Sequence, residues 1–331
     1  MDELKPSDLK TILHSKRANL YYLQHCRVLV KDGRVEYVTD QGSQSAYWNI
    51  PIANTTTILL GTGTSITQSA MREFAKAGVL VGFSGTGGSP LYAGTERDID
   101  IAWLTPQSEY RPTQYLQQWV SFWFDDDLRV QAAKHLQHQR LRQIAKHWPK
   151  ILSAQNVEDC DFNIDELKQI LQSTEQRITQ LDNVTDLLSL EAGMTKQLYK
   201  LAVKAVGYND FTRAKRGSGT DLANSYLDHG NYLAYGLAAC ACWVLGLPHG
   251  LAVMHGKTRR GGLVFDAADI IKDALVLPNA FISAMLGEDQ QEFRQRCLNT
   301  FRQADAMDIM IDTLQYTADS CATQAQKLKN Q

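Results

Sequence analysis

The sequence predicts an α+β protein, with a small N-terminal β domain followed by a larger all-α C-terminal domain. Short runs rich in β-branched and aliphatic residues dominate the first hundred residues, and this composition favours strands. From about residue 113 onward, apolar residues recur at intervals of three and four, which is the periodicity of amphipathic helices. Composition changes between residues 97 and 112, so we predict domains at residues 1–100 and 101–331.

In the N-terminal domain, strands are expected at residues 20–29, 34–39, 55–60 and 79–83. The Asp32-Gly33 pair between the first two runs is a hairpin signal. A short helix is expected at residues 65–76, and Gly85, Gly87 and Gly88 indicate a turn after the last strand.

The segment Gly61-Thr-Gly-Thr-Ser-Ile66 resembles part of a dinucleotide-binding fingerprint. Its third glycine position holds Ile66, and no alternation of strands and helices follows. We therefore interpret it as a tight turn between a strand and a helix.

In the C-terminal domain, Asn163 and Glu166 have the spacing of a capping box, and a helix follows them. Further helices are expected at residues 185–206, 221–247, 266–277, 289–304 and 308–329. The most apolar stretch, residues 232–254, has a continuous apolar run that ends at Leu247, short of the roughly 20 residues that a membrane span needs. It is interpreted as a buried central helix, and no membrane partner is expected.

Cysteine usage and the N-terminus indicate a cytoplasmic protein. The six cysteines include no Cys-x-x-Cys pair, which predicts free thiols in a reducing compartment. The first ten residues are polar and charged, unlike a secretory signal peptide.

Three acidic or imidazole side chains from separate segments stand out. Glu191 falls on the apolar stripe of its helix, where a carboxylate must be paired, protonated or bound to a metal. His255 follows an apolar run at the edge of a glycine-flanked loop, and Asp269 lies in an apolar helix. Two carboxylates and an imidazole suit Mg²⁺ or Mn²⁺, and such a site suits phosphoryl transfer.

Each of these residues also has a structural interpretation. Glu191 could serve in an ion pair. Asp266, at the expected start of a helix that Pro278 ends, is a good N-cap. Asp269 and Asp273 could form a solvated acidic face with it, since the three lie at i, i+3 and i+7.

Charge distribution bears on the partner. The net charge of −2 by itself argues against nucleic acid. The bases nevertheless gather in three clusters within the helical domain: Arg129 to Lys150, then Arg213, Lys215 and Arg216, then Lys257, Arg259 and Arg260. Solvated helix faces would explain them too, but basic loops beside a metal site favour a nucleic-acid partner.

These residues resemble the CRISPR-associated Cas-one family, the integrase of spacer acquisition. The resemblance runs through residues 59–67, 77–83 and 87–88, then 190–192, 224–235, 255–256 and 265–269. Its most specific part is the order Glu191, His255, Asp266 and Asp269. The Cys240-Ala-Cys242 helix and the loop at residues 255–260 are most similar to the type I-F branch. Thr62 departs from the family, which often has proline there.

The resemblance implies an N-terminal β domain, a C-terminal helical domain and a homodimer formed largely through the β domains. It implies that Glu191, His255 and Asp269 bind Mg²⁺ or Mn²⁺, and that Asp266 is a further ligand or a residue behind the ligands. Double-stranded DNA, as prespacer and CRISPR repeat, is the implied substrate. A Cas-two partner, in the type I-F branch fused to Cas-three, is implied as well.

The expected activity is that of a metal-dependent endonuclease and integrase, which joins prespacer 3′-hydroxyl ends to the repeat by transesterification. Two alternatives stay open from the sequence. One is a stand-alone metal-dependent DNA nuclease with the same site, and the other is a non-catalytic DNA-binding scaffold.

Overall fold

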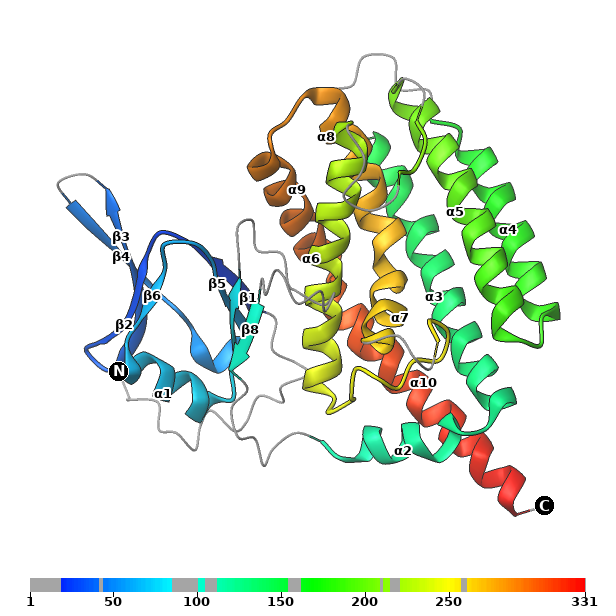
Figure 1. The fold of residues 1–331 in the computed structure, drawn as a ribbon, viewed down its shortest axis with the longest axis horizontal. Helices are drawn as coiled ribbons and strands as arrows, with labels where there is room; N and C mark the ends of the chain where they lie inside the picture. Colours follow the sequence, from blue (N-terminus) through cyan, green and yellow to red (C-terminus); the bar gives the residue numbers. More distant parts are fainter. Residues whose placement is uncertain are drawn as a thin grey trace. The chain divides into compact units, whose positions relative to one another are not determined.

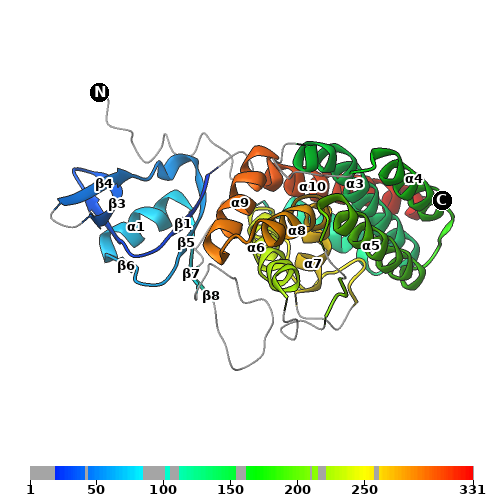
Figure 2. The ribbon, with the colours of Figure 1, turned by 90° about the horizontal axis from the view of Figure 1, so that it is seen from above.

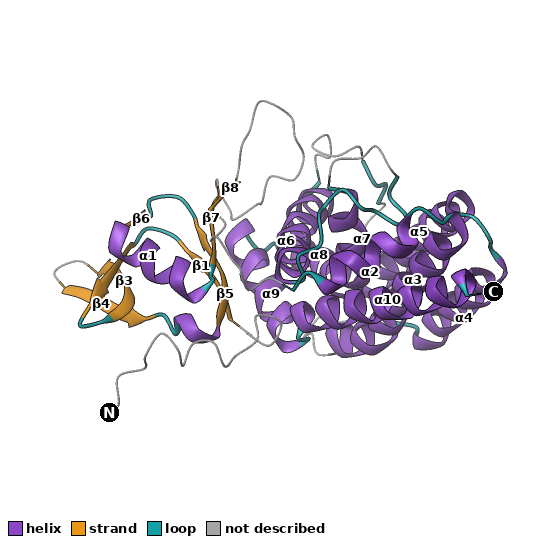
Figure 3. Ribbon diagram, turned by 90° about the horizontal axis from the view of Figure 1, so that it is seen from below, coloured by secondary structure: helices purple, strands orange, loops and turns teal. Residues whose placement is uncertain are grey.

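The computed structural model describes residues 19–41, 44–84, 101–104, 112–153, 162–208, 211–214, 221–256 and 261–330. The chain divides into two compact units, residues 1–112 and 113–331 (Figure 1). The described strands all belong to the first unit, and helices make up the second (Figure 3). The predicted α+β class is confirmed, whereas the boundary at residue 100 adjoins the undescribed segment 85–100 and stays a prediction.

The first unit holds two four-stranded sheets. Their strand orders are β1-β5-β7-β8 and β4-β3-β2-β6. The strands are β1 (Asn19–Leu23), β2 (Arg27–Lys31), β3 (Arg34–Gln41), β4 (Gln44–Asn49), β5 (Thr55–Leu60), β6 (Ser65–Ile66), β7 (Leu80–Ser84) and β8 (Ile101–Leu104). Val28, Ile58, Phe74 and Val81 are wholly buried between the sheets and the helix α1 (Gln68–Ala77).

The hairpin predicted at Asp32-Gly33 joins β2 to β3 in antiparallel register. Asp32 and Gly33 both have positive φ, of 49° and 75°, as a two-residue turn of matching twist requires. The single strand expected at residues 20–29 is wrong. His25 has a φ of 48°, and the chain turns there, so β1 pairs with β5 and β2 joins the other sheet.

The helix expected from residue 65 begins later. Ser65 and Ile66 pair with β2 instead, and the Thr67 hydroxyl caps the helix by accepting the amide of Ala70 at 3.3 Å. The glycine segment ahead of it forms a turn between β5 and β6, in which Gly63 has a φ of 70°.

The second unit is a helical bundle. Its helices are α2 (Gln114–Trp123), α3 (Asp126–Ser153), α4 (Ile164–Gln180), α5 (Val184–Val206), α6 (Leu222–Val244), α7 (Gly262–Ile271), α8 (Leu277–Leu286), α9 (Gln290–Gln303) and α10 (Ala306–Lys329). In Figure 1, α7 lies between α6 and α3, and both contact it. Viewed from above, α4 and α5 lie side by side along one flank of this bundle (Figure 2).

Helix α6 is the buried central helix that the apolar stretch predicts. Ala234, Ala238, Cys240 and Cys242 are wholly buried along it. Within the described ranges, no helix has the length and apolar character needed to cross a membrane. The five cysteines that the structure describes are buried and form no disulfide, in line with the predicted thiols, and Cys160 lies outside those residues.

The prediction that Asp266 starts a helix ended by Pro278 is wrong at both ends. Helix α7 begins at Gly262, which places Asp266 in its second turn. It then continues through a wide π turn, residues 272–276, directly into α8. Pro278 lies at the second residue of α8, directly after the π turn, and the helix continues past it.

Candidate metal centre

Three elements of the helical unit bring Glu191, His255 and Asp269 together. Glu191 lies on α5, His255 in the loop after α6, and Asp269 on α7. Each offers one ligand atom, and these atoms all lie within 4.8 Å of one another. The structure thus assembles the three residues that the sequence singles out, and their role as ligands stays a prediction.

Helix α5 places Glu191 beside its buried stripe. The helix is capped by Asn183, whose side chain accepts the amide of Asp186 at 2.9 Å. Leu187, Leu190 and Met194 are buried, and Glu191 lies among them with a largely buried carboxylate. The ion pair that the sequence allows exists, because Arg140 lies 3.0 Å from Oε1 of Glu191. Burial raises the pKa of Glu191, and the charge of Arg140 opposes that rise.

The loop that carries His255 is held by Asp266. One carboxylate oxygen of Asp266 accepts the amides of Val253 and Met254, at 2.7 and 3.1 Å. The other accepts the amide of His255 at 3.0 Å and its ring Nδ1 at 2.7 Å. Since Nδ1 donates to Asp266, the lone pair of the imidazole lies on Nε2.

Asp269 is almost wholly buried between two bases. Lys272 pairs with its Oδ1, and Nε2 of His255 lies 3.5 Å from its Oδ2. Burial alone would raise the pKa of Asp269, but Lys272, His255 and Arg140 outweigh it and lower that pKa. Burial alone would lower the pKa of His255, but the carboxylates of Asp269, Asp266 and Glu191 outweigh it and raise that pKa.

The donor set fits a divalent metal. Oδ2 of Asp269 is buried and has no hydrogen-bond donor among the described residues. An unsatisfied buried carboxylate oxygen is unfavourable unless a cation completes its surroundings. Two carboxylates with one imidazole suit Mn²⁺ or Mg²⁺.

Two buried residues behind the three, Arg140 and Asp273, were not predicted to belong to the site. Arg140 is wholly buried, so its place in a basic surface cluster is wrong. Asp273 is buried and pairs with Arg140, so the expectation of a solvated acidic face is also wrong. The signal available in the sequence was weak: Arg140 lies one residue before Leu141 and four after Leu136, on the buried side of its helix.

Of the expected DNA-binding residues, the structure describes only Arg213. Its guanidinium pairs with Asp228 and donates to the side chain of Asn224 at 2.7 Å, so much of it serves internal contacts. The other five lie outside the described residues; they are Lys215, Arg216, Lys257, Arg259 and Arg260.

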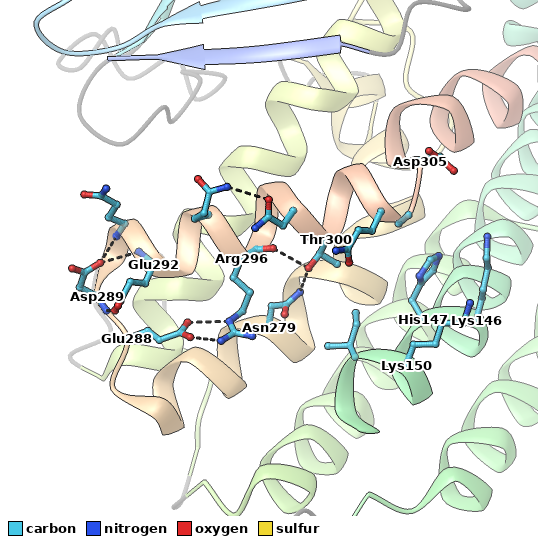
Figure 4. A pocket seen from close by; sticks show the side chains of 16 residues that line it. Lys146, His147, Lys150, Asn279, Glu288, Asp289, Glu292, Arg296, Thr300 and Asp305 are labelled. Atoms are coloured by element: carbon cyan, nitrogen blue, oxygen red, sulfur yellow. Dashed lines mark hydrogen bonds and ion pairs between the residues drawn. The ribbon is translucent and has the colours of Figure 1, made fainter. Parts of the chain in front are cut away.

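A separate polar groove of about 1040 Å³ lies along α9, and Figure 4 shows its lining side chains. Lys146 and Lys150 line it from α3, and Asp289 and Glu292 line it from the start of α9. None of Glu191, His255 and Asp269 lines this groove.

The helical unit thus holds a cluster of two carboxylates and an imidazole whose ligand atoms could hold a divalent metal ion. The family model for CRISPR associated protein Cas1 matches residues 20–295. The chain belongs to this family, the Cas-one family that the sequence resembles, and that prediction is confirmed.

Two relatives are similar over nearly their whole lengths. A CRISPR-associated endonuclease Cas1 from Pectobacterium atrosepticum is 64% identical over 315 residues, which cover 95% of this chain and 96% of the relative. Another, from Pseudomonas aeruginosa, is 61% identical over 327 residues, with 98% and 100% coverage. Both belong to type I-F systems, in agreement with the predicted branch.

Solved structures share the fold at low sequence identity. A CAS1 protein from Thermotoga maritima aligns with a TM-score of 0.65 and 14% identity, covering 92% of this chain and 96% of that one. The TtCas1–DNA complex aligns with a TM-score of 0.60 and 19% identity, covering 90% of this chain and 91% of that one. A chain of a Cas6-RT-Cas1–Cas2 complex aligns with a TM-score of 0.60 and 12% identity, covering 93% of this chain and 35% of that one.

Proposed function

We propose that this chain is a divalent-metal-dependent DNA endonuclease and integrase of CRISPR spacer acquisition. It joins prespacer 3′-hydroxyl ends to the CRISPR repeat. The observation that carries the proposal is the convergence of Glu191, His255 and Asp269 in a member of the Cas1 family. The name endonuclease of both high-identity relatives supports nuclease chemistry.

Mg²⁺ or Mn²⁺ would be held by the carboxylates of Glu191 and Asp269 and by Nε2 of His255. When bound, such a metal polarises a scissile phosphate and stabilises the charge that develops on its oxygens. Asp266 acts through His255: it fixes the ring so that Nε2 stays available. Lys272 fixes the carboxylate of Asp269.

The reaction is a transesterification. The prespacer 3′-oxygen forms a bond to phosphorus at the repeat boundary, and the bond from that phosphorus to the 3′-oxygen of the flanking strand breaks. The attacking hydroxyl loses its proton to solvent and the departing 3′-oxygen takes one up, so one phosphodiester replaces another and no external energy source is needed. His255 is a poor candidate for the general base. Its Nδ1 already bonds Asp266, and its Nε2 could not bind a metal and a proton together.

The partners follow from the same family membership. Double-stranded DNA would bind the basic side chains of Arg213, Lys215, Arg216, Lys257, Arg259 and Arg260. A homodimer formed through the β domains, and a Cas2 partner fused to Cas3, complete the proposal. The solved complexes with DNA and with Cas2 support this choice of partners.

The test is a joining assay with a labelled prespacer duplex and a repeat-containing target, with the partner protein added, in Mg²⁺ or Mn²⁺. Glu191→Gln, His255→Ala and Asp269→Asn should each reduce joined product at least about 100-fold, because each removes a ligand. Their affinity for the duplex should stay close to that of the unchanged chain. Glu175→Gln is the matched control, since that carboxylate on α4 is 57% exposed.

Each other result has a distinct meaning. Normal joining by one variant removes that residue from the site. Metal-dependent cleavage without joining would identify a stand-alone nuclease. Binding with no metal-dependent product, and no effect of a chelator, would identify a scaffold.

A further inference from the structure

A buried guanidinium lies directly behind the candidate metal ligands. Arg140, at the middle of α3, has no exposed surface. It reaches two carboxylates on different elements: Glu191 on α5, at 3.0 Å, and Asp273 in the π turn. The Thr195 hydroxyl, one turn after Glu191, accepts from Arg140 at 2.8 Å and lies 3.2 Å from Asp273. The guanidinium therefore ties three elements together.

The π turn is held to α3 by a second contact. The indole Nε1 of Trp148, two turns after Arg140, donates to the backbone carbonyl of Asp273 at 2.8 Å. Both side chains on α3 are wholly buried. A π turn disturbs the regular hydrogen bonding of a helix and is often found at functional sites. Here it directly follows α7, and only two residues separate it from Asp269 on that helix.

We propose that Arg140 is a positioning residue for the metal ligands, working with Asp273 as its anchor. Asp273 fixes the guanidinium at the end of α7, and the guanidinium in turn fixes Glu191. The separation between Glu191 and Asp269 is thus set through Arg140. The inference rests on the metal site proposed above.

A purely electrostatic role and a positioning role of Arg140 predict opposite changes in cation affinity when Arg140 is removed. Arg140 is a positive charge beside metal ligands, so its removal would strengthen cation binding if charge were its only contribution. If it positions Glu191, its removal weakens cation binding although a repulsive charge is removed. Arg140→Lys separates the two in another way, because it keeps the charge and lacks the planar fork that bonds two partners.

The experiment measures Mn²⁺ affinity of the full chain by the decrease of the free-ion EPR signal, at one pH and below the unfolding temperature. Arg140→Gln and Arg140→Lys should weaken Mn²⁺ binding about 10- to 100-fold, the range for residues behind metal ligands. Arg129→Gln is the matched control: it lies three turns earlier on α3 and pairs with Asp126. It should bind as the unchanged chain does.

A double-substitution cycle ties the effect to Glu191. In the Glu191→Gln background, adding Arg140→Gln should weaken binding no further, since the positioned group is already altered. Unchanged or tighter binding by Arg140→Gln, or by Arg140→Lys where the first variant does not fold, overturns the proposal. An effect that adds fully to that of Glu191→Gln also overturns it. If Glu191→Gln and Asp269→Asn both bind Mn²⁺ normally, the metal assignment itself is wrong.

Discussion

The carboxylate of Asp266 is fully hydrogen-bonded beside the candidate metal centre. It is buried and accepts four hydrogen bonds, two on each oxygen. Three of the donors are consecutive backbone amides, residues 253–255, which explains how a loop without regular structure holds an imidazole in place.

Replacement of Asp266 by Asn should lower the free energy of unfolding by about 3 kcal/mol, because whichever oxygen becomes an amide leaves two buried donors unpaired. Urea unfolding of the metal-free chain measures this. Asp312→Asn, at an exposed position on α10, should change stability by less than about 0.5 kcal/mol. Equal stability of the two variants would contradict this role for Asp266.

At this scale, sequence reasoning found the residues and missed their connections. Glu191 could be singled out because a carboxylate on an apolar stripe is anomalous. Arg140 could not, because its long-range partners at positions 191 and 273 are set by tertiary packing. The same limit applies to Asp266, whose bonding to residues 253–255 no local spacing reveals.

Helix α6 approaches its neighbours closely at one glycine. A Cβ added at Gly230 would lie 2.4 Å from Val276, at the end of the π turn, and 3.0 Å from Phe293 of α9. Gly193 on α5 is the contrasting case, since it is exposed and a Cβ there would meet nothing within 4 Å.

Gly230→Ala should therefore destabilise the chain by about 1–3 kcal/mol, through overpacking against Val276. Gly193→Ala should stabilise it by about 0.5–1 kcal/mol, because alanine loses less backbone entropy in a helix. Thermal or urea unfolding of the pair provides its own control. A stabilising Gly230→Ala would show that α6 and the π turn separate readily.

Elements with strong periodicity were predictable and irregular ones were not. The helix predicted at residues 185–206 agrees with α5 to within one residue, because its apolar residues recur at helical intervals. The π turn was missed, since the residues 272–276 fit an ordinary helix by composition. Their geometry depends on contacts with Arg140 and Trp148.

For the whole molecule, the near-neutral net charge of −2 conceals an uneven distribution. Acidic side chains gather at the candidate metal centre, where Glu191, Asp266, Asp269 and Asp273 lie, and Arg140 and Lys272 offset part of their charge. The predicted order of a β domain before a helical one is confirmed, because β-prone composition and helical periodicity are properties of whole segments. The placement of bases beyond the described residues stays a prediction.

Arg259→Ala combined with Arg260→Ala should weaken duplex binding and make its dependence on salt shallower. Removing one interaction with a DNA phosphate lowers the slope of log affinity against log salt by about 0.9, so removing two lowers it by about 2. Lys327→Ala with Lys329→Ala, at the exposed end of α10, is the charge-matched control. An unchanged slope would exclude the loop at residues 257–260 from the DNA path.

Helix α3 contributes side chains to the candidate metal centre and to the groove along α9. Its 28 residues span about 42 Å, with Arg140 against the candidate metal centre and Lys146 and Lys150 lining the groove along α9. Ligands at these two places would both contact side chains of this one helix. Thermodynamic linkage then requires reciprocity: a groove ligand that changes the affinity for metal must have its own affinity changed by metal by the same factor.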